Sequence, residues 1–80
     1  QTATDSMLRG DFEAAKSAYQ RALAADPNYA PAYRGQGLVL EHLGRTKDAA
    51  RAFRQFLRLR PNDKGADKIR TRLQALEATP

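Results

Sequence analysis

Apolar side chains recur at steps of three and four residues along most of the chain, which places them on one face of an α-helix. Four such stripes lie within residues 11–25, 30–43, 46–59 and 63–77, and a shorter helix is expected over 1–9. In chain order the stripes are Ala15, Ala18, Tyr19, Ala22 and Leu23; Tyr33, Gly37, Leu40 and Leu43; Ala49, Ala52, Phe53, Phe56 and Leu57; and Ala66, Ile69, Leu73 and Leu76. No window alternates apolar and polar residues as a strand would. The pattern therefore predicts an all-α fold.

Residues that favour helix ends separate these stripes. Gly10 and Gly44 each follow an expected helix, where a residue without a Cβ can adopt the left-handed conformation that closes the last turn. Asp11 and Thr46 stand just beyond them, and each has a side-chain oxygen able to cap the next helix. The prolines agree with these helix boundaries. Pro27 and Pro61 follow the helices expected over 11–25 and 46–59, and Pro31 stands in the first turn of the helix expected over 30–43.

The chain repeats itself with a period of 34 residues. GDFEAAKSAYQRALAADPN occupies residues 10–28 and GRTKDAARAFRQFLRLRPN occupies residues 44–62. Tyr19 corresponds to Phe53, which exchanges one aromatic ring for another. The identical pairs are Gly10 and Gly44, Ala15 and Ala49, Ala18 and Ala52, Leu23 and Leu57, Pro27 and Pro61, and Asn28 and Asn62. One helical hairpin cannot bury its own apolar face, so we expect the two copies to stack on a shared core.

A 34-residue period with one helical hairpin per period resembles the tetratricopeptide repeat. Tyr33 and Phe53 stand where that family has large aromatic residues, and Gly37 and Ala49 stand where it has small residues at a close helix crossing. The resemblance implies antiparallel helical hairpins stacked as a short right-handed α-solenoid of about two units plus a C-terminal capping helix. It divides residues 1–80, taken as a single domain, into a first repeat with a shortened first helix (1–29), a second repeat (30–63), a capping helix (64–77) and a tail (78–80).

Two positions depart from the family pattern. Gln36 stands where the family usually has leucine, and Phe56 stands where it prefers alanine. If the bulk of Phe56 widens the gap that a third hairpin would fill, it supports an end of the stack after the second repeat. The N-terminal end is less complete, because helix 1–9 offers only Ala3, Met7 and Leu8 to a core. Either upstream repeats or another chain would cover that end.

Composition and charge narrow the possible functions. The 80 residues contain no cysteine, which excludes a disulfide framework, a thiolate metal site and a thiol nucleophile. The net charge of +5 lies entirely in residues 41–80, which hold ten basic and five acidic side chains. A basic half invites an acidic partner. No segment is apolar enough to span a membrane and no signal-peptide pattern is present, which leaves both the cytoplasm and the periplasm open.

Residues for catalysis are scarce. His42 is the only histidine, so a paired imidazole metal site cannot form. Ser6 and Ser17 have no recognisable activating neighbours, and Gly35 and Gly37 lie inside an expected helix rather than in a phosphate-binding loop. The sequence therefore predicts no enzymatic activity, no cofactor and no bound metal.

Binding of another protein is the better-supported function. In stacks of this family the first helix of each hairpin lines a concave groove that takes a peptide segment. The corresponding residues here, which we predict to contact a partner, are Met7 and Leu8 in the first repeat, Arg34, Leu38 and Glu41 in the second, and Lys68 and Arg72 in the end helix. Apolar side chains beside cations suit a partner segment that has an acidic and an apolar residue. The chain is thus expected to be an adaptor or scaffold module.

Two alternatives remain. A second copy of the chain could dock on the incomplete N-terminal end at Met7 and Leu8, giving a homo-oligomer. A cationic stripe on helix 46–59 could instead contact nucleic acid or an anionic membrane, and it consists of Lys47, Arg51, Arg54 and Arg58. The first repeat has no matching cations and no exposed aromatic residues suit base stacking, so nucleic acid and membrane are the less favoured partners.

Overall fold

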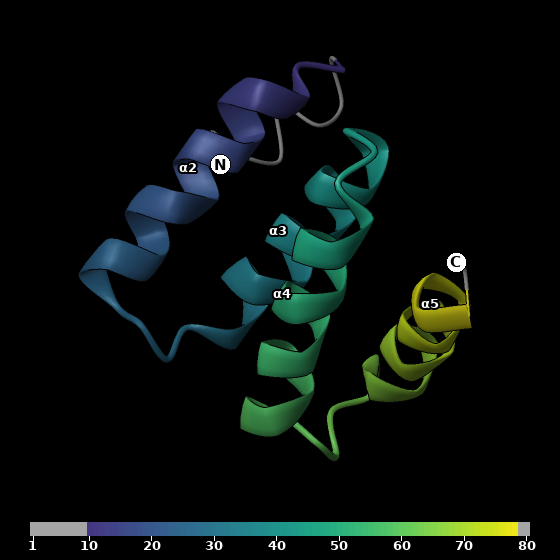
Figure 1. Ribbon diagram of the computed structural model, residues 1–80. Coiled ribbons are helices and arrows are strands. Elements are labelled where there is room, and N and C mark those ends of the chain that lie inside the picture. Colours follow the sequence, from purple (N-terminus) through teal and green to yellow (C-terminus); the bar gives the residue numbers. More distant parts are fainter. Residues whose placement is uncertain (1–9, 79–80) are drawn as a thin grey trace.

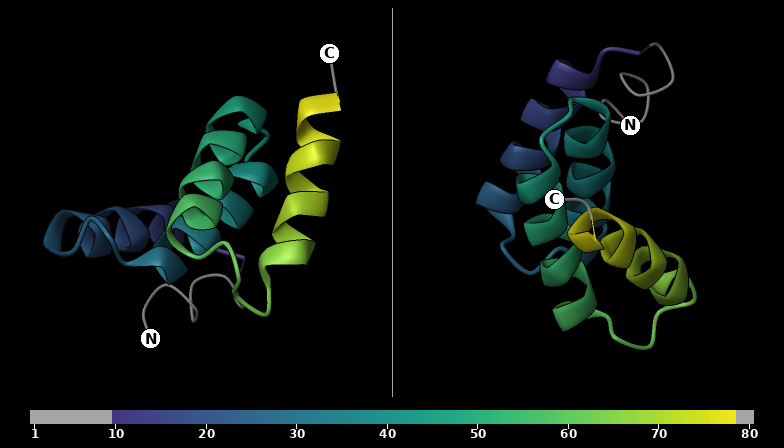
Figure 2. Two further views of the ribbon diagram at one scale, coloured as in Figure 1. Left: turned by 90° about the horizontal axis from the view of Figure 1, so that it is seen from below. Right: turned by 45° about the vertical axis from the view of Figure 1, so that its right-hand side comes forward.

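The computed structural model describes residues 10–78, which form helices α2 (Phe12–Ala25), α3 (Ala30–His42), α4 (Thr46–Leu59) and α5 (Ala66–Ala78). Each helix packs against the next one in the chain. Figures 1 and 2 show α2 at one end of the row, α3 and α4 in the middle and α5 at the other end. The described part of the chain is therefore all-α, with helices packed in sequential pairs, as predicted. The helix expected over 1–9 lies outside the described residues.

The turn between α3 and α4 depends on Gly44. Its φ of +78° lies in the left-handed region, which costs a residue without a Cβ little. The Gly44 amide donates to the Glu41 carbonyl at 3.0 Å, and the Arg45 amide donates to the Leu40 carbonyl at 2.8 Å. This pair of bonds is the Schellman motif, which satisfies carbonyls that the end of a helix leaves free. Gly10 has the same φ before α2, so the left-handed conformation predicted for both glycines is confirmed; the helix expected before Gly10 lies outside the described residues.

Only one of the two predicted N-caps is present. The Asp11 carboxylate accepts a hydrogen bond from the Ala14 amide at 3.1 Å, as expected of a cap. The prediction for Thr46 is wrong, because Arg45 occupies the cap position of α4 and makes no side-chain cap bond. Arg45 already closes the end of α3 through its amide, so the chain enters α4 immediately and Thr46 becomes the first helical residue.

The end helix also starts later than the pattern predicts. The Asp63 carboxylate accepts a hydrogen bond from the Gly65 amide at 2.9 Å, and the Asp63 carbonyl accepts one from the Ala66 amide at 3.0 Å. Aspartate commonly bonds the backbone two residues on in this way, which stabilises a turn. The helix therefore begins at Ala66 rather than at residue 63, and it continues to Ala78 rather than ending at 77.

The core lies between α3, α4 and α5. Phe53 and Phe56 of α4 are fully or almost fully buried, and Ile69 of α5 packs in the same cluster. The other buried members are Ala30, Leu40, Ala49 and Ala52, and the half-buried side chains packed against them are Tyr33, Leu38, Leu57, Leu59, Leu73 and Leu76. The apolar stripes predicted on α4 and α5 thus form the core.

Two glycines let α3 approach its neighbours on two sides. A Cβ on Gly35 would stand 2.2 Å from Cζ of Tyr19 in α2, and a Cβ on Gly37 would stand 2.3 Å from Cε1 of Phe53 in α4. Real Cβ contacts essentially never come within 3.0 Å. Each aromatic ring therefore rests where α3 has no side chain. The sequence predicted the close approach at Gly37 but not the one at Gly35.

Candidate functional site

The predicted groove residues of α3 and α5 meet across the two helices. Nε of Arg72 in α5 donates to Oε1 of Glu41 in α3 at 2.9 Å. Both side chains remain partly in water, at 47% and 31% exposed, so the pair contributes little to folding stability, about 0–1 kcal/mol. The pair joins two residues that were expected to face a partner separately.

Arg34 reaches from α3 toward the start of α5. Its guanidinium carbon lies 5.8 Å from the ring centroid of Phe56, a cation–π contact. Its Nη1 atom lies 3.5 Å from the point where a Cβ on Gly65 would stand. The charge of Arg34 therefore borders the turn between α4 and α5. Arg34 is exposed, so this charge is accessible to a partner.

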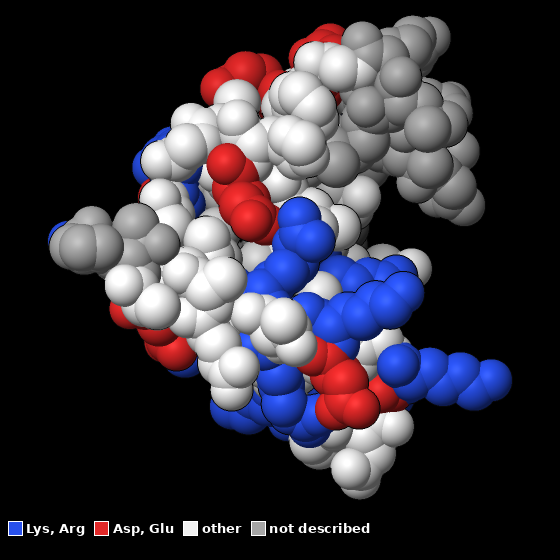
Figure 3. Space-filling model, turned by 90° about the vertical axis from the view of Figure 1, so that its right-hand side faces the viewer, with Lys and Arg blue, Asp and Glu red and all other residues white. Residues whose placement is uncertain are grey.

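The two remaining groove residues of this region differ in accessibility. Leu38 is half-buried and packs against the core, so it offers only part of its surface to a partner. Lys68 is exposed and makes no hydrogen bond or ion pair within residues 10–78. Figure 3 shows Lys and Arg side chains gathered on the face that α5 presents, with acidic side chains among them. Met7 and Leu8 lie outside the described residues.

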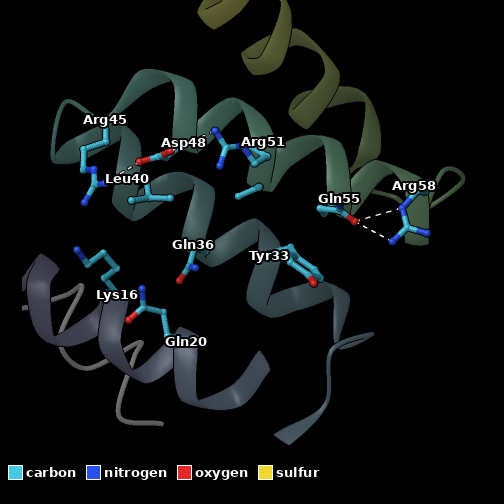
Figure 4. A pocket seen from close by; sticks show the side chains of 11 residues that line it. Lys16, Gln20, Tyr33, Gln36, Leu40, Arg45, Asp48, Arg51, Gln55 and Arg58 are labelled. Atoms are coloured by element: carbon cyan, nitrogen blue, oxygen red, sulfur yellow. Dashed lines mark hydrogen bonds and ion pairs between the residues drawn. The ribbon is translucent and has the colours of Figure 1, made fainter. Parts of the chain in front are cut away.

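The structure also contains a polar cavity that the sequence did not predict. It has a volume of about 520 Å³ and lies between α2 and α4 with α3 at its base. Figure 4 shows Lys16 and Gln20 approaching it from α2 and Gln36 pointing into it from α3. The remaining lining residues are Tyr33, Leu40, Arg45, Asp48, Arg51, Ala52, Gln55 and Arg58. None of the predicted groove residues on α3 and α5 lines this cavity.

Gln36 is the unusual member of this lining. Its Oε1 atom is buried and accepts no hydrogen bond from any residue between 10 and 78. Leaving a buried acceptor unpaired costs about 1–3 kcal/mol, whereas a leucine there would cost nothing of this kind. The departure of Gln36 from the family pattern was the one sequence signal that could have drawn attention to this cavity.

The cations of the predicted stripe on α4 border two cavities, one on each side of the helix. Arg51 and Arg58 line the cavity beside α2, whereas Lys47 and Arg54 line a second cavity of about 800 Å³ on the α5 side. Arg54 forms an ion pair with Glu77 of α5. Arg51 also borders the second cavity. Arg51 therefore lies between the two cavities, with Arg58 on one side and Lys47 and Arg54 on the other.

Other functional groups are limited in this part of the chain. Residues 10–78 bring together no cluster of three or more His, Cys, Asp or Glu side chains that could hold a metal ion. The His42 ring stacks on Phe12 with centroids 4.6 Å apart. None of the described helices has the length and apolar character needed to cross a membrane.

Comparison with known families agrees with this architecture. Residues 6–74 match the sequence model of the tetratricopeptide repeat. The chain belongs to the tetratricopeptide repeat family. No curated protein matches it. Proteins of this family are generally protein–protein interaction modules and typically non-catalytic, and the helices seen here are consistent with about two tetratricopeptide units.

The tetratricopeptide period explains how α5 differs from α3. One period of 34 residues after Gly35 and Gly37 stand Ile69 and Thr71. Tyr19 of α2 rests against Gly35 of the following helix. Its counterpart Phe53 of α4 instead lies in one cluster with Ile69, the residue of α5 that corresponds to Gly35. Because α5 has side chains at the positions of both glycines, an aromatic ring cannot pack against its bare backbone as Phe53 packs against Gly37 of α3. The capping role of α5 stays a prediction.

Proposed function

We propose that this tetratricopeptide repeat chain is a non-catalytic adaptor that binds a segment of a partner protein on the surface shared by α3 and α5. The proposal is supported by the ion pair that Arg72 of α5 makes with Glu41 of α3, by the exposed cations Arg34 and Lys68 on the same two helices, and by membership of a family of protein-binding modules. The balance of charge there is positive. An acidic partner segment is therefore the expected ligand.

The ion pair between Arg72 and Glu41 indicates how the segment would bind. Arg72 already holds one carboxylate at 2.9 Å, so its geometry suits a second one from a partner. A partner acid would compete with Glu41 for the same guanidinium. Lys68 has no such internal competitor among residues 10–78, and the exposed part of Leu38 can contact an apolar residue next to the acid.

Selection from a displayed peptide library, followed by calorimetric titration of the selected peptides, tests the proposal. We expect the selected peptides to carry Asp or Glu beside an apolar residue. The double variant Arg34→Ala and Arg72→Ala should weaken their binding by about tenfold, because charge-assisted contacts at a wet surface contribute far less than buried ones. The variant Glu41→Gln should instead strengthen binding, because it removes the competing carboxylate.

A matched control is the double variant Arg21→Ala and Arg60→Ala. Both arginines are exposed, form no ion pair between residues 10 and 78 and are not among the proposed contact residues, so the variant changes net charge equally. Equal affinity loss in both double variants would reduce the effect to general electrostatic attraction. Unchanged affinity in both would place the partner elsewhere, with the predicted N-terminal end at Met7 and Leu8 as the next candidate.

A further inference from the structure

The cavity between α2 and α4 is lined by more positive than negative charge. Lys16, Arg45, Arg51 and Arg58 border it, whereas Asp48 is the only acid among its lining residues in the described part of the chain. Asp48 is already shared, with Arg45 at 2.8 Å and with Arg51 at 3.7 Å. Lys16 is paired with Glu13 at 3.4 Å, but Arg58 has no acidic partner among residues 10–78, so the described lining keeps a positive excess that would attract an occupant with negative groups.

Arg58 provides a fixed anchor at one end of this cavity. Its Nε and Nη2 atoms both donate to Oε1 of Gln55, at 3.1 and 2.8 Å (Figure 4). Gln55 is neutral, so it orients the guanidinium without cancelling its charge. No ion pair to Arg58 forms within residues 10–78. The guanidinium is therefore positioned to receive a carboxylate.

The amide of Gln36 lies at the base of the same cavity, with Oε1 buried and unpartnered among residues 10–78. The last torsion of a glutamine side chain is broad, so the amide can turn toward an occupant at little cost. Gln20 and Gln55 add two further amides to the lining. Each glutamine amide both donates and accepts hydrogen bonds, as a peptide group does.

The cavity is elongated along α4. Its lining residues on that helix run from Arg45, at the cap, to Arg58, which corresponds to a rise of about 20 Å. About six residues of extended peptide cover this distance. We propose that this cavity binds an extended, acidic peptide segment, whose carboxylates pair with Arg51 and Arg58 and whose backbone hydrogen-bonds to Gln36.

This site is separate from the surface in the proposed function. The cavity uses Tyr33, Gln36 and Leu40, whereas the α3 residues of the proposed groove are Arg34, Leu38 and Glu41, at positions about 100° or more around the helix from Gln36. A phosphate backbone fits the cavity less well, because phosphodiester groups accept hydrogen bonds but donate none to an amide oxygen. Tyr33 is half-buried and its hydroxyl donates to the Pro27 carbonyl at 2.9 Å, so it is not free to stack on a base.

Fluorescence anisotropy with a labelled, end-capped hexapeptide of alternating Glu and Gly tests the proposal on the 80-residue chain. A hexapeptide with Gln in place of Glu and a short oligothymidylate serve as comparison probes. The double variant Arg51→Ala and Arg58→Ala should weaken binding of the acidic peptide by about tenfold or more. The control variant Lys47→Ala and Arg54→Ala has the same helix, spacing and charge change, and its affinity should stay within about twofold of the parent chain.

Gln36→Leu gives a second, charge-neutral test. It should weaken peptide binding by about fivefold or more while raising the melting temperature by about 4 °C or more, because it removes an unpaired buried acceptor. A side chain retained only for packing would not lower affinity while raising stability. Melting curves of every variant show directly whether a loss of binding reflects unfolding.

Several results would overturn the proposal. Equal loss of affinity in the two double variants on α4 would show that the peptide is held by non-specific electrostatic attraction. Unchanged affinity in Gln36→Leu would show that the glutamine amide does not contact the peptide. Tighter binding of the oligothymidylate, lost in Arg51→Ala and Arg58→Ala, would identify a nucleic-acid site instead. Loss of peptide binding only in Arg34→Ala and Arg72→Ala would place the peptide on the α3–α5 surface, which would support the proposed function and refute this second site.

Discussion

Replacing Gly37 by alanine tests the closest approach between α3 and α4. The new Cβ would stand 2.3 Å from Cε1 and 2.5 Å from Cδ1 of Phe53. Ordinary contact begins at 3.4 Å, so the ring would have to retreat by about 1 Å. Phe53 is 0% exposed and close-packed in the core, so a retreat of this size requires the two helices to separate.

The expected cost follows from two opposing terms. Overpacking a core typically costs about 1–3 kcal/mol, and alanine recovers about 0.8–1 kcal/mol of helix propensity relative to glycine. We therefore expect Gly37→Ala to lower the free energy of unfolding by up to about 2 kcal/mol. Gly37→Leu adds three more carbons at the same point and should cost more. A chain of this size has only about 4–12 kcal/mol of stability, so the leucine variant should lose a large part of it.

Gly35→Ala is the matched comparison, because its Cβ would stand equally near a ring, 2.2 Å from Cζ of Tyr19. Tyr19 is only half-buried, and the atoms that clash are at the far end of its side chain. The tyrosine can therefore turn toward solvent, and the helix-propensity gain offsets much of the cost. We expect Gly35→Ala to be less destabilising than Gly37→Ala by about 1 kcal/mol or more.

Urea unfolding followed by far-ultraviolet circular dichroism measures both changes. The combination of Gly37→Ala with Phe53→Leu completes a double-mutant cycle, in which the smaller side chain should relieve part of the clash with a coupling of about 0.5–3 kcal/mol. A Gly37→Ala chain as stable as the parent, or a cycle without coupling, would contradict the packing of Phe53 against Gly37.

Two further predictions concern the N-cap of α2 and the cationic stripe on α4. Asp11→Ala should lower the free energy of unfolding by about 1 kcal/mol, because the Ala14 amide loses its side-chain partner; an unchanged urea midpoint would contradict the capping role. Reversing Arg51, Arg54 and Arg58 to Glu should leave partner affinity on the α3–α5 surface largely intact at about 0.15 M salt, where charges more than about 8 Å apart are screened. Steeply salt-dependent binding of DNA or RNA that this reversal abolishes would instead argue against the adaptor function.

The sequence alone predicted the elements that depend on local chemistry. Helix spacing, proline positions and the left-handed glycines are decided within a few residues, so α2, α3 and α4 begin and end within a residue of their predicted bounds. The 34-residue recurrence predicted the stacked hairpins and the family for the same reason, since each unit encodes the face it must bury. Local patterns failed at Thr46 and at the start of α5, where Arg45 and Asp63 bond the backbone in ways that residue type alone does not specify.

Contacts between helices were decided only by the tertiary structure. Arg72 and Glu41 are 31 residues apart in the chain, and the sequence assigned both to a partner rather than to each other. The stripe on α4 was predicted as one surface; in the structure Arg58 borders the cavity beside α2, Arg54 pairs with Glu77 of α5, and Arg51 borders the cavities on both sides. Helical periodicity determines the direction in which a side chain leaves its helix. The residues that this side chain contacts depend on how closely the neighbouring helix packs. That distance is set here by bare backbone at Gly35 and Gly37, and the repeat pattern predicted only the close approach at Gly37.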